Sequence, residues 1–266
     1  MEYLAYLASA LIGVSLGLIG GGGSILTVPV MAYLFGINPL LATSYSLFIV
    51  GTTSLVGAYQ NFRNKLVDMR TALLFGLSSI TTVFLIRKFL VPLIPVHLFS
   101  LAGYPVTSNM LTMILFALLM LAASFSMIRE GKPVEKVRAG RPANNLMLML
   151  YGVGIGFATG LLGAGGGFLL IPTLVVLLGM PMNEAVGTSL MIIALNALIG
   201  FIGDLGHFII DWPFLLKVTG IAVAGVFAGI FLSKKVDARN LKKGFGWSVL
   251  FMGAYILLRE MICKAH

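Results

Sequence analysis

The sequence predicts an all-α integral membrane protein built from two inverted-topology repeats. Each repeat is expected to hold one glycine-broken helix, re-entrant or discontinuous, and about three full transmembrane helices. Of the 266 residues, 59% are hydrophobic and 10% are charged, too few charges to cover a soluble protein of this length. The segment 13–34 returns in similar form at 154–177, with a glycine run inside each copy. Corresponding loops of the two copies differ in charge.

Apolar stretches long enough to enter a bilayer predict the individual helices. The first and the fifth of these stretches contain the glycine runs. Each glycine costs a helix ~1 kcal/mol relative to alanine, so a run of them interrupts the helix. In hydrocarbon, the backbone groups freed by such a break need protein or a water-filled cavity around them. The stretches are 3–35, 40–60, 70–91, 107–128, 145–178, 185–203, 214–233 and 244–262.

Two similar halves divide the chain. Residues 1–128 form the first membrane repeat, 129–145 a basic cytoplasmic linker, and 146–266 the second membrane repeat. Internal similarity of this kind constrains the whole architecture. The matched pairs are Gly13 with Gly156, Gly17 with Gly160, Gly20 with Gly163, Pro29 with Pro172, Thr43 with Thr188 and Ser44 with Ser189.

Charge sets the expected orientation of the two halves. Loop 63–70 carries three Lys and Arg, whereas its counterpart 204–211 carries none. Because Lys and Arg collect in cytoplasmic loops, the two loops are expected on opposite membrane faces. The basic clusters 129–141 and 234–243 share a side with 63–70 only if each broken segment enters and leaves on one face. Both termini of this multi-pass protein of the cell (inner) membrane are then extracytoplasmic.

A few residues stand outside that pattern. The cations that this topology leaves towards the positive-poor face are Arg87, Lys88 and Lys217. Segment 89–106, which contains three prolines, is expected to be irregular or interfacial and to cap the extracytoplasmic face, with a gate as the alternative.

The glycine breaks predict an anion site. The half-helices after the breaks, 24–35 and 168–178, begin with N–H groups that have no intrahelical acceptor and carry about half a positive charge. Two such ends near the membrane midplane hold an anion without any Lys or Arg. A compact oxyanion suits such donors because it presents several acceptor oxygens.

The candidate substrate ligands are glycines of the two runs, hydroxyls at matched positions, and one intramembrane amide. The structural alternatives are hydroxyls that bond their own helix backbone and glycines that let helices pack closely. The candidates are Gly21, Gly22, Gly23, Ser24, Thr43, Ser44, Gly165, Gly166, Gly167, Thr188, Ser189 and Asn196.

Residues for catalysis are scarce. The spans contain no carboxylate pair, Cys/His cluster or metal-ligand spacing, so we expect no enzyme, no metal and no cofactor. Asp204, His207 and Asp211 form the one compact titratable group, and His207 and Asp204 are the candidates for proton coupling. The basic clusters follow membrane topology, so the expected partners are lipids and a small anion, not nucleic acid. Small-residue faces such as Gly225 with Gly229 permit a homodimer.

The doubled glycine signature at 20–29 and 160–172, each followed by a Thr-Ser pair at 42–44 and 187–189, resembles the TauE/SafE family. Members are described as exporters of sulfite or sulfonates, so the resemblance implies a bacterial or archaeal inner-membrane anion exporter. The second copy has Gly167 where the first has Ser24, which leaves the two half-sites non-identical. By position the family motif covers Gly20, Gly21, Gly22, Gly23, Ser24, Pro29, Thr43 and Ser44, then Gly163, Gly165, Gly166, Gly167, Pro172, Thr188 and Ser189.

The expected function is a secondary transporter that exports a small sulfur-containing anion, such as sulfite, a sulfonate or a related organosulfur acid. The alternatives are a passive anion channel or facilitator, and a permease for another small carboxylate or oxyanion. An integral membrane enzyme or assembly factor is disfavoured by the shortage of titratable residues inside the spans.

Overall fold

The computed structural model describes residues 2–19, 21–95, 97–101, 104–128, 145–163, 165–233 and 238–262. These parts are helical apart from one β-hairpin, and six of their helices are long and apolar enough to cross a membrane. The predicted all-helical membrane architecture with several spans is confirmed at this level. The predicted linker 129–145, except Asn145, lies outside the described residues, as does Gly20.

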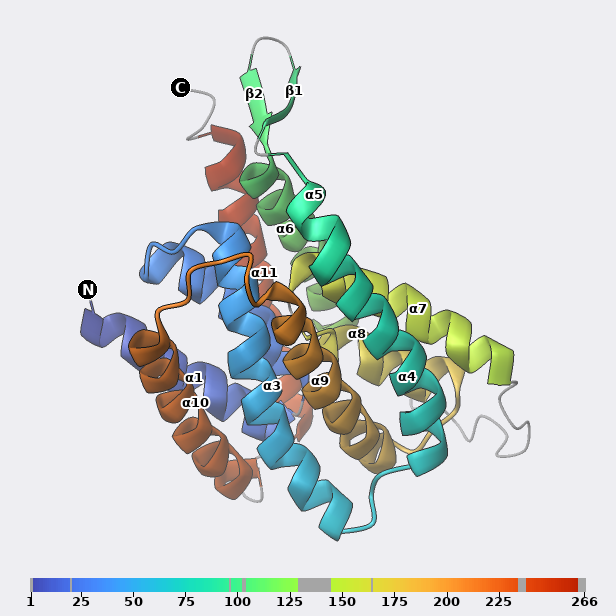
Figure 1. Ribbon diagram of the computed structural model, residues 1–266. Helices are drawn as coiled ribbons and strands as arrows, with labels where there is room; N and C mark the ends of the chain where they lie inside the picture. Colours follow the sequence, from blue (N-terminus) through green and yellow to red (C-terminus); the bar gives the residue numbers. More distant parts are fainter. Residues whose placement is uncertain are drawn as a thin grey trace.

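The first half begins with a helix that ends at the glycine run (Figure 1). Asn38 caps the longest helix of this half, since its Oδ1 accepts from the Leu40 N–H at 3.0 Å. The elements are α1 (Glu2–Ile19), 3₁₀ segment η1 (Gly21–Leu26), α2 (Thr27–Pro29), π-helical η2 (Val30–Leu34), α3 (Pro39–Arg63), α4 (Met69–Leu85), π-helical η3 (Ile86–Leu90), α5 (Val91–Leu93), strands β1 (His97–Leu101) and β2 (Tyr104–Thr107), and α6 (Ser108–Ile128).

The second half repeats this order without the hairpin. In both halves the matched prolines, Pro29 and Pro172, are followed by a π-helical turn. Proline has no N–H for the regular helical ladder, so a local change of helix type is expected there. The elements are α7 (Asn145–Leu162), α8 (Gly167–Pro172), π-helical η4 (Thr173–Leu177), α9 (Met182–Asp204), α10 (Trp212–Ser233) and α11 (Ala238–Ile262).

Two parallel helix pairs join the halves. Helix α1 packs on α10, and α7 packs on α4 (Figure 1). Gly13 lies against Ala222 and Gly17 against Val226 four residues later, so α1 and α10 run in the same direction. The α4–α7 pair has the same arrangement through the matched glycines of α7. Its contacts are Gly156 against Ser79 and Gly160 against Ile86. Small residues let these backbones approach closely.

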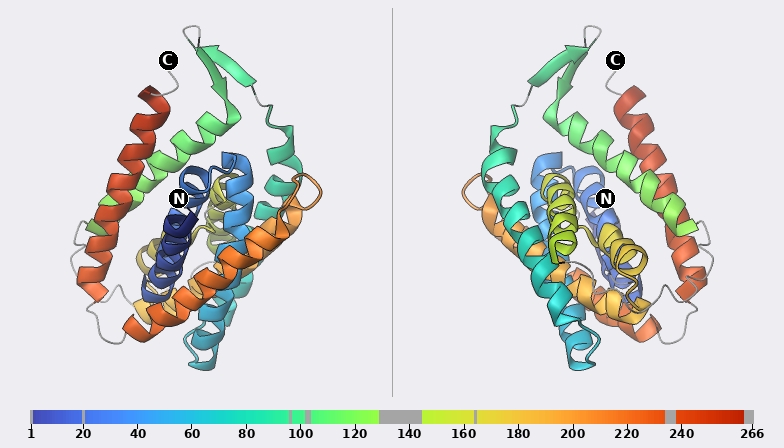
Figure 2. Two further views of the ribbon diagram at one scale, coloured as in Figure 1. Left: turned by 90° about the vertical axis from the view of Figure 1, so that its left-hand side faces the viewer. Right: turned by 90° about the vertical axis from the view of Figure 1, so that its right-hand side faces the viewer.

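Two antiparallel pairs complete the bundle. Helix α3 packs on α9, with Gly51 against Leu198 and Gly200 against Leu47. Because the residue number rises on one helix as it falls on the other, α3 and α9 run in opposite directions. Helices α6 and α11 lie side by side in both views of Figure 2. They are antiparallel too, since Gly246 lies against Ile128 and Gly253 against Met120.

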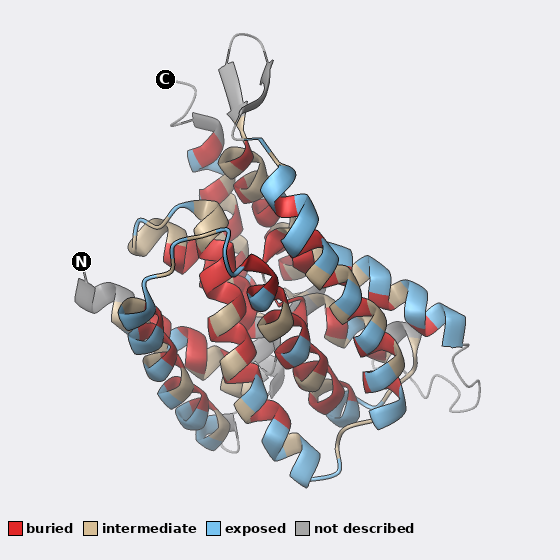
Figure 3. Ribbon diagram, in the orientation of Figure 1, coloured by how far each residue is buried: buried red, intermediate tan, exposed pale blue. Residues whose placement is uncertain are grey.

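Helices α3 and α9 form the centre of the bundle. In each of them, 67% of the residues in the apolar 18-residue stretch are buried inside the structure, against 39% in the other four candidate spans. Figure 3 shows the buried residues gathered on these two helices, with exposed residues on the outer sides of α4, α7 and α10. Those outer faces carry large apolar side chains, as expected where lipid is the solvent. Examples are Leu73, Leu77, Phe157, Leu216 and Phe227.

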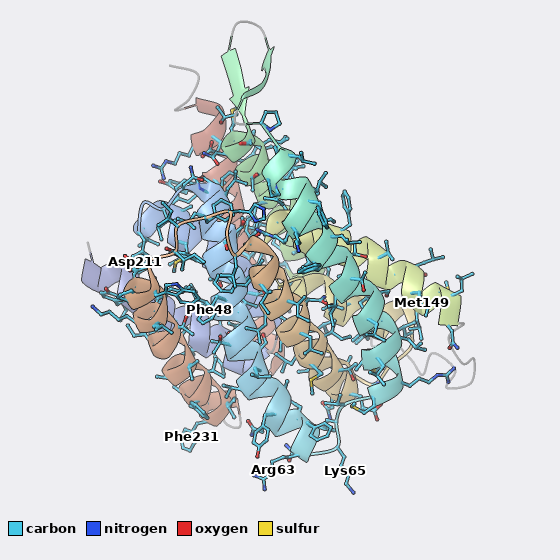
Figure 4. All side chains as sticks on the ribbon, viewed as in Figure 1. Phe48, Arg63, Lys65, Met149, Asp211 and Phe231 are labelled. Atoms are coloured by element: carbon cyan, nitrogen blue, oxygen red, sulfur yellow. The ribbon has the colours of Figure 1, made fainter. Side chains whose placement is uncertain are left out.

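The antiparallel packing of α3 and α9 gives the bundle two distinct ends. Arg63 ends α3, and Figure 4 shows it beside Lys65 at one end of the bundle, here named the Arg63 end. Asp204 ends α9 and therefore lies towards the opposite end, here named the Asp204 end. The basic segment 63–70 and the segment 204–211, which has no Lys or Arg, thus lie at opposite ends.

Candidate functional site

The second glycine run interrupts its helix with left-handed backbone. Helix α7 ends at Leu162, and α8 begins at Gly167. Between them, Gly163, Gly165 and Gly166 have φ of +68°, +66° and +72°. Side chains with a Cβ rarely adopt this region, which explains the choice of glycine.

The first glycine run forms a 3₁₀ helix, which has fewer residues per turn than an α-helix. Gly21, Gly22 and Gly23 begin the 3₁₀ segment η1, and Ser24 in the same segment is fully buried. Gly23 lies against Ser15 of α1, so the chain turns back onto the helix it has just left. Segment η1 packs against α8. The glycine-rich segments of the two halves therefore lie next to each other.

The second run is held between the two central helices. A Cβ added to Gly165 would lie 2.6 Å from Val50 Cγ1 of α3 and 3.2 Å from Ile193 Cγ2 of α9. One turn beyond Ile193 is Asn196, which is fully buried and donates from Nδ2 to Ser79 Oγ at 2.7 Å. Its Oδ1 has no hydrogen-bond partner among the described residues.

The matched hydroxyl pairs are buried but do not meet. Thr43 and Ser44 lie near the Asp204 end of α3, whereas Thr188 and Ser189 lie near the Arg63 end of α9. Thr188 Oγ1 accepts from the backbone N–H of Asp68 at 2.9 Å. Because α3 and α9 are antiparallel, residues at equivalent positions of the two repeats lie at opposite ends of the helix pair. The Thr-Ser pair of one helix is therefore far from that of the other.

Thr43 lies beside an ion pair that no sequence motif indicates. Arg87 Nη1 donates to Thr43 Oγ1 at 2.9 Å and to Asp204 Oδ2 at 3.1 Å. Both charged side chains are buried, with exposed fractions of 0% and 1%. Gly163 adjoins this pair, because a Cβ added there would lie 2.6 Å from Arg87 Nη2. In the sequence, this ion pair is indicated only by the position of Arg87 at the positive-poor end of an apolar span, where a cation needs a partner.

The candidates for proton coupling are adjacent to each other. His207 is exposed, and its backbone N–H donates to the backbone carbonyl of buried Asp204 at 3.1 Å. Asp211 has a different role, since its Oδ1 accepts from the Phe214 N–H at 3.1 Å at the start of α10. Over the described residues, no group of three or more His, Cys, Asp or Glu is placed to hold a metal ion.

Comparison with known proteins places these features in a family. The profile of the family described as "Sulfite exporter TauE/SafE" matches residues 5–256. A probable membrane transporter protein of Xylella fastidiosa is 28% identical over 258 residues, covering 95% of this chain and 94% of the relative. One of Bacillus subtilis is 28% identical over 254 residues, covering 96% and 99%. One of Methanocaldococcus jannaschii is 23% identical over 273 residues, covering 96% and 95%. No solved structure matches the chain.

Proposed function

The chain belongs to the TauE/SafE sulfite exporter family and is a membrane transporter, and from this premise we propose that it exports a small sulfur-containing anion across the cytoplasmic membrane. Sulfite, a sulfonate or a related organosulfur acid is the expected substrate. The observation that carries the proposal is the packing of η1 against α8, which juxtaposes the two glycine-rich segments inside the bundle.

Backbone groups supply the proposed site. At the left-handed residues Gly163, Gly165 and Gly166 the helical hydrogen-bond ladder is interrupted. The N–H of Gly163 still donates to the carbonyl of Thr159 at 2.9 Å. Gly165 and Gly166 therefore supply the N–H groups proposed for the ligand, and glycine lets that ligand approach the backbone. A sulfur oxyanion offers several acceptor oxygens on one atom, so it matches a set of converging donors. Asn196 is near this region, but its Nδ2 already donates to Ser79, and its Oδ1, which has no partner among the described residues, is an acceptor and does not bind an anion.

The inverted repeat is part of the same proposal. Exchanging the two halves converts the α1–α10 pair into the α7–α4 pair, and both pairs are parallel. The same exchange returns α3–α9 and α6–α11 to themselves, and both are antiparallel. This pattern of parallel and antiparallel pairs is expected when a two-fold axis relates two oppositely oriented halves. The same symmetry gives a carrier two equivalent conformations, each open to one side of the membrane. We assign the Arg63 end to the cytoplasm and both termini to the other face.

Reconstituted flux tests the function. Purified protein is reconstituted into liposomes, the liposomes are loaded with radiolabelled sulfite or sulfoacetate, and a pH step is imposed across the membrane. A proton-coupled carrier concentrates the anion against its gradient, whereas a passive channel or facilitator only equilibrates it. Absence of flux for both anions, with faster flux of a simple carboxylate, would reject the sulfur substrate.

Two glycine variants test the location of the site. Gly22→Val and Gly165→Val are expected to abolish sulfite flux, because a side chain at either position would move the backbone proposed to contact the ligand; at Gly165 the added Cβ would lie 2.6 Å from Val50 Cγ1. Gly154→Ala on α7 is the control, since no atom lies within 4 Å of an added Cβ there. Wild-type flux in both valine variants would reject the site.

A further inference from the structure

Arg87 is buried, and the two nitrogens that carry three of its five N–H donors have no hydrogen-bond partner among the described residues. Its side chain has an exposed fraction of 0%, yet Nε and Nη2 have no hydrogen-bond partner among the described residues. Nη1 alone makes both polar contacts, to Asp204 and Thr43. A buried donor without a partner is costly, so two on one guanidinium call for a physical explanation.

The free atoms form one edge of the guanidinium. Nε and Nη2 lie on the same side of the planar group, and their N–H bonds point in nearly the same direction. That edge binds two oxygens of a carboxylate, phosphate or sulfonate in bidentate fashion. The contact with Asp204 uses a different atom, Nη1, and only one carboxylate oxygen. The ion pair therefore leaves the bidentate edge unoccupied.

This edge lies beside the glycine run of the proposed anion site. Gly163, the first residue of the left-handed run, lies next to Nη2, and no side chain fits between them. Gly203 lies against the Cβ of Arg87 from α9. The guanidinium is thus placed where the interrupted backbone of the second half meets α3 and α9.

We propose that the Nε–Nη2 edge of Arg87 binds the transported oxyanion, with Asp204 as the internal counter-ion that takes up one proton for each anion bound. This inference rests on the proposed function and identifies both the anion ligand and the coupling group. It requires an anion with two or more oxygens on one atom, as in sulfite and sulfonates.

Charge balance supplies the coupling. Without substrate, Asp204 neutralises Arg87 in the buried site. An anion at the Nε–Nη2 edge would place two negative charges around one positive charge, which is unfavourable away from water. Protonation of Asp204 restores balance, and the proton adds to Oδ1, which makes no hydrogen bond among the described residues. Besides Arg87, the groups that interact with this carboxylate are the Ser44 hydroxyl and the His207 imidazole. The proton is taken up from the face on which the anion binds and is released with the anion on the opposite face, so one proton crosses the membrane with each anion.

Direct binding tests the proposal with sulfite and sulfoacetate as probes. The protein is purified in detergent, and affinity is measured by calorimetry between about pH 6 and about pH 8, expressed per fully ionised anion. Wild-type affinity should fall about tenfold per pH unit, because one proton binds with each anion. Arg87→Gln should weaken binding at least about a hundredfold through loss of two charge-assisted hydrogen bonds. Arg87→Lys, which keeps the charge but not the fork, should give partial recovery.

Asp204→Asn separates coupling from structure. This variant keeps a hydrogen-bond acceptor for Arg87 but cannot be protonated, so it should bind the anion with no pH dependence. In liposomes it should exchange anion for anion yet lose accumulation driven by a pH step. Lys88→Gln is the matched control, because Lys88 is an exposed cation next to Arg87 in sequence and should leave affinity unchanged.

The outcomes distinguish the two claims. If the wild type binds neither probe, the proposed function fails and this inference fails with it. If the wild type binds but folded Arg87→Gln binds within about threefold of it, only the assignment of Arg87 fails. The double variant Arg87→Gln with Asp204→Asn removes both charges and tests binding if the single variant does not fold. A wild-type pH slope in Asp204→Asn would overturn the coupling role in every case.

Discussion

Replacing Gly165 by alanine tests how the second glycine run is held. The residue has φ of +66°, and a left-handed conformation costs a residue with a Cβ about 1–2 kcal/mol. The new Cβ would also lie 2.6 Å from Val50 Cγ1 and 3.2 Å from Ile193 Cγ2. Overpacking of this kind costs about 1–3 kcal/mol. Gly165→Ala should therefore lower the free energy of unfolding by about 2–5 kcal/mol.

A second substitution separates the two contributions. Val50→Ala removes the γ carbons that the new Cβ would meet, so it should relieve the steric part of the cost and leave the backbone part. A double-mutant cycle between the two positions should then give a favourable coupling of about 1–3 kcal/mol. Gly154→Ala on α7 is the control. It should be neutral or stabilising by up to about 1 kcal/mol, because alanine favours the helix and an added Cβ meets no atom within 4 Å.

Unfolding in mixed micelles, followed by circular dichroism at increasing dodecyl sulfate, measures these differences. The four proteins of the cycle and the control are compared under the same lipid and detergent conditions. Wild-type stability in Gly165→Ala would refute the left-handed, packed conformation of the run. A coupling near zero would leave the backbone cost in place but refute the contact with Val50.

Three further predictions concern topology and packing. Single cysteines at Asn64 and Gly206 should react with an impermeant thiol reagent from opposite membrane faces, and labelling from one face would reject the inverted arrangement. Thr188→Val removes the acceptor of the Asp68 N–H and should cost about 1–3 kcal/mol of unfolding free energy; an unchanged denaturant midpoint would contradict that contact. Gly13→Leu places a side chain against the α10 backbone and should lower the thermal midpoint of unfolding, and a wild-type midpoint would reject the close α1–α10 packing.

Helix positions were readable from the sequence because lipid enforces a simple pattern. The predicted stretches 40–60, 185–203 and 214–233 correspond to α3, α9 and α10, with bounds that differ by a few residues. In a bilayer a spanning segment needs both length and apolar side chains, so composition alone reports it. The ends of the helices are set by local caps such as Asn38 and Asp68, which shift the bounds.

The candidate site was only partly readable. Glycines such as Gly163 and Gly165 are visible in a sequence because left-handed backbone restricts the residue type. The hydroxyls at Thr43 and Thr188 were paired by internal similarity, but their separation along α3 and α9 follows from antiparallel packing, which no local pattern encodes. The sequence identifies Arg87 only as a cation on the positive-poor side. Its partner Asp204 lies 117 residues away along the chain, so their contact has no local signature.

The sequence by itself determined the solvent of this protein, its division into similar halves and the places where helices are interrupted, because hydropathy, repetition and glycine runs are properties of the chain alone. Only the tertiary structure decided that η1 lies against α8 and that Arg87, Asp204 and Thr43 converge beside Gly163. These contacts depend on the direction in which distant helices pack. In a buried, low-dielectric interior that direction determines which charge finds a counter-ion and which hydrogen-bond donors are left for a ligand.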